Sequence, residues 1–143
     1  PLASQPSALA VAWVKVDARF VNTDGSGWKV SEIRTGTRDW VKLGPLTDAL
    51  NERKRLKART ELETIAKALE EFRRHRGFYI ASDQHTVVID HLSPRYLPQV
   101  IRLDPWNQPY KYEGQRDRFV LSSGGPDRTH GTPDDVRLAN SSR

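Results

Sequence analysis

The residues with the clearest chemical potential lie in a loop near the C-terminus, at positions 122–136. This loop contains the carboxylates of Asp127, Asp134 and Asp135, and its Gly and Pro content excludes both helix and regular strand. Carboxylates that lie this close together repel one another unless a cation neutralises them. Calcium is the natural candidate, because it takes about six to eight oxygen ligands and mixes carboxylates with backbone carbonyls. These three aspartates therefore predict a calcium site.

A second interpretation of the same aspartates remains open. In a loop rich in Gly and Pro, Asp commonly forms a turn by accepting a hydrogen bond from the backbone two residues on. Asp134 fits that role as well as it fits a metal ligand. The loop is not an EF-hand, because the D-x-[DN]-x-[DN]-G pattern with a late Glu is absent. His130 also lies in the loop, but a hard oxygen site does not need it.

The sequence contains no pattern typical of an enzyme active site. Its four histidines do not have the spacing of metal ligands. No serine has a G-x-S-x-G context, and no glycine-rich phosphate loop precedes a helix. The absence of cysteine excludes disulfides and thiolate metal sites. We therefore predict a protein that is not an enzyme.

A long helix is predicted from about Leu46 to His75, and it is the main element that must support the acidic loop. Apolar residues at helical spacing, such as Leu62, Ile65 and Leu69, form one stripe for burial. Basic residues in the last turn and Gly77 just beyond it are typical of a helix C-terminus.

The segments after this helix predict a small antiparallel sheet. Short apolar segments surround a turn at 82–84, and one helical turn is expected within 90–97. Two strands at 109–113 and 118–122 are expected to form a hairpin, and a short strand is expected to follow the acidic loop from 136. The hairpin is expected to pack on the helix through Tyr110, Tyr112, Phe119 and Leu121.

Three motifs give the chain a family resemblance. The segment 104–112, Asp-Pro-Trp-Asn-Gln-Pro-Tyr-Lys-Tyr, resembles the D-P-W-G-x-P-Y-x-Y segment of the major pseudopilin of type II secretion, protein G. The leucine- and proline-rich segment 92–98 resembles the one that precedes it in that family, and the loop ending in Asp-Asp-Val resembles the family's calcium loop. The resemblance covers roughly residues 57–138. Asn107 replaces a glycine of the family pattern, and Asn also tolerates the left-handed conformation.

The resemblance implies an α+β fold, in which a long N-terminal helix packs on a small antiparallel sheet, and a calcium ion in the C-terminal loop. The segment 123–127 is one residue longer than the usual family loop, which leaves the carbonyl ligands open. The implied ligands are the carboxylates of Asp127, Asp134 and Asp135, the carbonyl of Ser123 or Gly124, and the carbonyl of Thr129 or Thr132. The implied function is that of an extracytoplasmic structural subunit that assembles into a fibre with itself or with other pseudopilins.

The first 45 residues have no counterpart in that family and are predicted to form a separate β-meander, with residues 46–143 as the pseudopilin-like domain. Val14, Val16, Ala18 and Phe20 alternate with polar residues, which indicates a half-buried strand, and two further strands follow. We expect the meander to pack on the rest of the molecule. Trp13, Trp28 and Trp40 are interpreted as core or cross-strand residues rather than as a ligand platform.

Charge and hydropathy limit the kinds of partner that the protein can have. The formal net charge is +5, but acidic residues interleave with the basic run at 53–59, which favours a solvated helix face over nucleic-acid binding. No stretch approaches the roughly 20 apolar residues of a membrane span, so membrane contact is expected only through a segment absent from this chain. A first residue Pro1 rather than Met favours the removal of such a segment. The alternative is a soluble periplasmic or secreted binding module that reuses the pseudopilin fold, with the meander as its working part.

Overall fold

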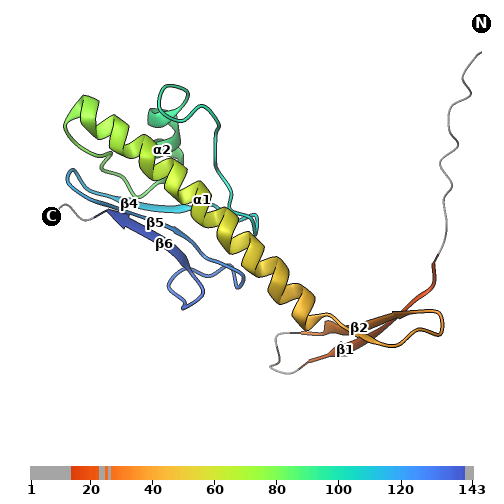
Figure 1. Ribbon diagram of the computed structural model, residues 1–143. Helices are drawn as coiled ribbons and strands as arrows, with labels where there is room; N and C mark the ends of the chain where they lie inside the picture. The colour runs from red at the N-terminus through yellow and green to blue at the C-terminus, as the bar shows by residue number, and fades with distance from the viewer. Residues whose placement is uncertain (1–13, 23–24, 26, 141–143) are drawn as a thin grey trace, which may run out of the picture. The chain divides into compact units, whose positions relative to one another are not determined.

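The computed structural model describes residues 14–22, 25 and 27–140 (Figure 1). The chain divides into two compact units, residues 1–48 and residues 49–143. The larger unit contains a long helix, a short helix and a three-stranded sheet, and the smaller unit contains a second three-stranded sheet. Within the described residues, no helix combines the length and the apolar character that a membrane span requires.

The long helix α1 spans Gly44–Arg76, close to the predicted bounds. The predicted stripe residues Leu62, Ile65 and Leu69 are buried, together with Ala58, Ala68 and Phe72. The helix ends as its sequence indicates, since the amide of Gly77 donates to the carbonyl of Arg73 at 2.7 Å and Gly77 has a φ of 83°. That left-handed conformation is readily adopted by glycine.

The sheet of the larger unit has three antiparallel strands, β4 (Lys111–Gly114), β5 (Phe119–Ser123) and β6 (Val136–Asn140), in that order. In Figure 1, α1 runs along one face of this sheet. The core lies between them, and the predicted hairpin contacts are all buried there, at Tyr110, Tyr112, Phe119 and Leu121. The predicted α+β fold is therefore confirmed.

The helical turn expected within 90–97 is present, because the amide of Tyr96 donates to the carbonyl of Leu92 at 2.8 Å. It continues helix α2 (His85–Leu92), which begins earlier than expected and contains Val88. Val88, Ile89 and Leu92 share one face of α2 and are buried in the core, so tertiary burial outweighs the weak helix propensity of β-branched residues. Strand β6 extends to Asn140, and the side chain of Asn140 donates to Glu70 and to Tyr79.

The smaller unit contains the predicted meander. Its strands β1 (Val16–Val21), β2 (Lys29–Thr35) and β3 (Val41–Lys42) are antiparallel and adjacent in sequence order. The tryptophans were expected to be core or cross-strand residues, and Trp28, which is 74% exposed, is not a core residue. Trp40 instead covers the guanidinium carbons of Arg19 and Arg34, which lie 4.0 and 4.7 Å from its ring centroid. Trp13 lies outside the described residues.

Candidate functional site

The C-terminal loop is closed at its base by the sheet. Ser123 at the end of β5 pairs with Val136 at the start of β6, so the chain leaves and returns at neighbouring positions. Further along, the two arms of the loop meet at Gly125, which has a φ of 64°. A Cβ at this position would lie 2.4 Å from the carbonyl oxygen of Asp134, so only glycine allows the arms to approach this closely.

Two of the predicted ligands are linked to each other across this loop. One oxygen of the Asp134 carboxylate accepts from the backbone amide of Asp127 at 3.2 Å, and the other accepts from the Thr132 hydroxyl at 2.5 Å. The Thr132 hydroxyl is the largest influence that holds the pKa of Asp134 below its usual range. The Asp127 carboxylate accepts from the amide of Thr129 at 2.8 Å, which is the turn geometry that the alternative interpretation predicts.

Asp135 has an oxygen without a partner. Its Oδ2 accepts from the amide of Gly131 at 2.9 Å, whereas its Oδ1 is shielded from solvent and has no hydrogen-bond partner. A buried acceptor left unpaired is unusual in proteins and calls for an unseen donor or cation. The other carboxylates and carbonyls of the loop carry oxygens, the ligand type that calcium prefers. Within residues 14–140, excluding positions 23, 24 and 26, no three His, Cys, Asp or Glu side chains are grouped closely enough to hold a metal ion.

The candidate carbonyl ligands lie on both arms of the same loop. Ser123 and Gly124 are buried at its start, and the Thr129 carbonyl accepts from the Thr132 hydroxyl at 3.1 Å. The carbonyl of Thr132 accepts from the amide of Asp135 at 3.2 Å. Because a carbonyl oxygen has two lone pairs, Thr129 and Thr132 can each accept a further bond.

The residue that the sequence analysis missed is Asp104, which is 3% exposed. Its Oδ1 accepts from the amides of Trp106 and Gln108, both at 2.9 Å, and its Oδ2 accepts from the Ser123 hydroxyl at 2.5 Å. The same hydroxyl oxygen of Ser123 accepts from the amide of Gly125 at 3.2 Å. Asp104 thus joins the Asp-Pro-Trp turn to the first arm of the acidic loop. The motif at 104–112, which begins with Asp104, was the sequence feature that could have indicated this role.

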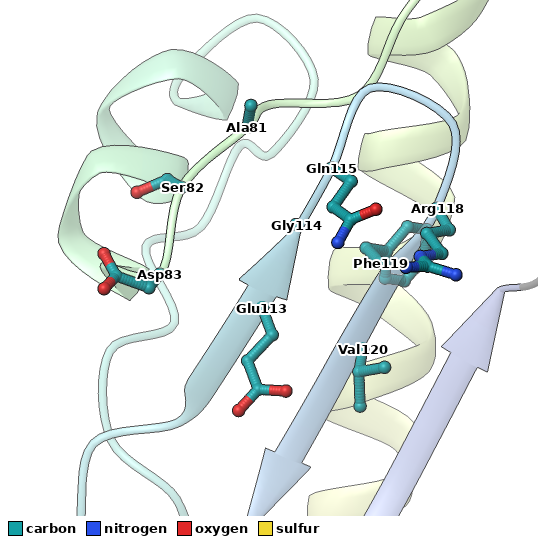
Figure 2. Close-up of a pocket in the computed structure, with 9 residues that line it drawn as sticks. All are labelled: Ala81, Ser82, Asp83, Glu113, Gly114, Gln115, Arg118, Phe119 and Val120. Atoms are coloured by element: carbon teal, nitrogen blue, oxygen red, sulfur yellow. The ribbon is translucent and has the colours of Figure 1, made fainter.

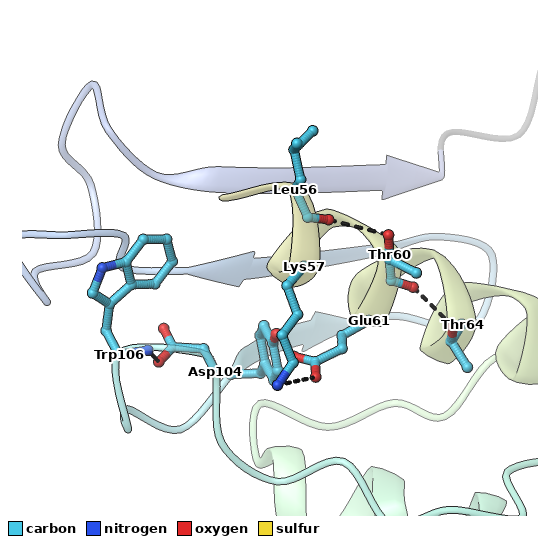
Figure 3. Close-up of polar contacts among 8 residues, drawn as sticks. Leu56, Lys57, Thr60, Glu61, Thr64, Asp104 and Trp106 are labelled. Carbon is cyan, nitrogen blue, oxygen red and sulfur yellow. Dashed lines mark hydrogen bonds and ion pairs between the residues drawn. The ribbon is translucent and has the colours of Figure 1, made fainter. Parts of the chain in front are cut away.

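The turn is also attached to α1. The indole nitrogen of Trp106 donates to the side-chain oxygen of Asn51 at 3.1 Å. Figure 3 shows Asp104 and Trp106 on the loop that runs beside the segment of α1 containing Glu61. The Glu61 carboxylate accepts from the hydroxyl of Tyr110 at 2.6 Å, and this contact adds to burial in raising the pKa of Tyr110. The acidic loop is therefore connected to the helix through side-chain hydrogen bonds.

A separate open cavity of about 530 Å³ lies between the segment 81–83 and strands β4 and β5 (Figure 2). Its ionisable lining residues are Asp83, Glu113 and Arg118. Its lining contains no histidine or cysteine, and its one serine has no basic partner among the lining residues. The lining therefore contains no Ser–His or Cys–His pair.

The family described as type II secretion system (T2SS), protein G matches residues 45–141. Comparisons with curated proteins and with solved structures gave no match. The matched range includes α2, strands β4 to β6 and the acidic loop, and it leaves the meander outside.

Proposed function

Because the chain belongs to the type II secretion system protein G family, we propose that it is a pseudopilin subunit whose C-terminal loop binds calcium and is stabilised by it. The family match, which spans α1 and the whole sheet, carries this proposal. Pseudopilins have a structural rather than an enzymatic role, and assembly with copies of itself or with other pseudopilins, outside the cytoplasm, follows from the same membership. Nucleic acid is not among the proposed partners.

The proposed calcium ligands are the carboxylates of Asp127, Asp134 and Asp135. The unpaired Oδ1 of Asp135 supports this assignment, because a cation would supply the missing partner. The carbonyls of Ser123 or Gly124 and of Thr129 or Thr132 would complete the shell. Bound calcium would neutralise the loop's carboxylates. The chain itself holds the two arms together at Gly125 and through the contact between Asp134 and Asp127.

Thermal unfolding in calcium and in chelator tests the calcium site. An ion that binds only the folded state stabilises it by about 2.7 kcal/mol at a hundredfold excess over its Kd, so the parent should melt at a higher temperature in calcium. Asp134→Ala should abolish that increase, and Asp83→Asn, which changes an exposed aspartate outside the loop, should retain it. Identical melting temperatures of the parent in the two solutions, at millimolar calcium, would contradict the site.

A binding module that reuses the fold is the second candidate. Its support is the exposed Trp28, which lies in the meander outside the family match. Lysine cross-linking of the native protein in its own cells separates the candidates. A ladder of multimers supports the fibre subunit, whereas a single adduct with one different protein supports the binding module.

A further inference from the structure

The meander is a sheet with two chemically different faces. On one face, Arg19 pairs with Glu32 at 2.7 Å, and Arg34 pairs with Asp17 at 3.0 Å. Trp40 lies over both guanidinium groups. These four charges of the polar face are therefore matched within the sheet itself.

The opposite face is apolar. Side chains alternate along a strand, so the residues between those of the polar face point the other way. The pairing places Ala18 opposite Ile33 and Ile33 opposite Val41, and beyond a register shift it places Phe20 opposite Val30. We call this surface the apolar face, and it consists of Val16, Ala18, Phe20, Trp28, Val30, Ile33 and Val41.

Within the smaller unit, no described residue covers the apolar face. Trp28 is 74% exposed and Phe20 is 59% exposed, and Val16 and Val41 are more than half exposed. No described residue between positions 14 and 48 is buried, so this part of the chain has no core. A three-stranded sheet needs a packed hydrophobic face to be stable. The meander should therefore acquire its core from a partner surface.

A second copy of the chain fits this surface. Phe20 and Trp28, with side chains of about 150–250 Å² each, together expose about 200–330 Å². With the exposed aliphatic residues of the face, the exposed apolar area is on the order of 600 Å². Two such faces stacked together bury about 1,200 Å², which is the lower end of the range for specific interfaces. The apolar face contains no charged residue, so two copies can meet without opposing like charges. A face that packs on itself satisfies the symmetry of a twofold dimer.

We propose that the apolar face of the meander is a homodimer interface, in which two three-stranded sheets stack into a six-stranded sandwich around Phe20, Trp28 and Val30. Aligned sheets pack about 10 Å apart with interdigitating side chains, which supplies each meander with the core that it lacks. This dimer lies outside the family match and does not require calcium, so it goes beyond the proposed function.

Sedimentation of the full chain over a range of concentrations, in chelator, tests this dimer. The parent should dimerise with a Kd on the order of micromolar, as expected for a small interface. Phe20→Lys should weaken dimerisation at least tenfold. Val100→Lys alters an equally exposed apolar residue of the larger unit and should leave the Kd unchanged.

A second variant controls for the possibility that Phe20→Lys weakens dimerisation by misfolding the meander. Trp28→Ser changes a residue that precedes β2 and is largely exposed, so it should leave the strands intact and still weaken dimerisation at least tenfold. A parent that stays monomeric at the highest concentration would overturn the proposal, and so would variants that dimerise as the parent does. If the monomeric parent binds anionic phospholipid vesicles and Trp28→Ser does not, the apolar face is a lipid-binding surface instead. None of these outcomes depends on the calcium site.

Discussion

Substitution of Asp104 should destabilise the larger unit severely. Its buried carboxylate accepts three hydrogen bonds, from the amides of Trp106 and Gln108 and from the hydroxyl of Ser123. Hydrogen bonds to a charged group contribute about 1.5–3 kcal/mol each, and the donors left behind would be unsatisfied. Because such contacts are not additive, we expect Asp104→Ala to lower the free energy of unfolding by about 3–5 kcal/mol.

Urea unfolding followed by circular dichroism measures this loss. Ser123→Ala removes one of the three contacts of Asp104 and also the acceptor of the Gly125 amide, so it should cost about 2–3 kcal/mol. The double variant should lose less stability than the sum of the two single losses, since both substitutions remove the same contact. Asp83→Ala, at an exposed aspartate, is the control and should stay within about 0.5 kcal/mol of the parent. An Asp104→Ala variant as stable as this control would refute the assigned role of Asp104.

Two further predictions concern the core and the acidic loop. Burial lowers the pKa of His85 from its ordinary value of 6.5, so the unfolded chain binds a proton at a higher pH than the folded chain, and stability should fall as pH drops below that value. Urea unfolding at about pH 7.5 and 5.5 should show this fall in the parent and a smaller fall in His85→Gln. Equal falls in the two proteins would contradict the prediction. Gly125→Ala should cost about 2 kcal/mol through the clash with Asp134 and the positive φ. At Gly131, φ is also positive (94°), but no atom of a distant residue lies within 4 Å of an added Cβ. Gly131→Ala should therefore lower the thermal stability less than Gly125→Ala does. Equal losses in thermal melts of the two variants would contradict the close approach at Gly125.

The sequence by itself determined the features that depend on local pattern. The apolar stripe of α1 and its end at Gly77 follow from helical periodicity and C-terminal capping, which act within a few residues. The order of the three motifs sufficed to identify the family later matched over residues 45–141. Asn107, where the family has glycine, adopts the expected left-handed conformation with a φ of 62°. The calcium ligands remain a prediction.

Only the tertiary structure decided which distant groups meet and which faces are covered. Asp104 and Ser123 are 19 residues apart, and no periodicity relates a carboxylate in a turn to a hydroxyl at the end of a strand. Val88 lies in a helix because the core buries one face of α2, although its local sequence also suits a strand. In the meander, alternation correctly predicted the strands but not the exposure of Trp28. An alternating pattern specifies which side chains share a face, whereas the exposure of that face depends on what packs against it.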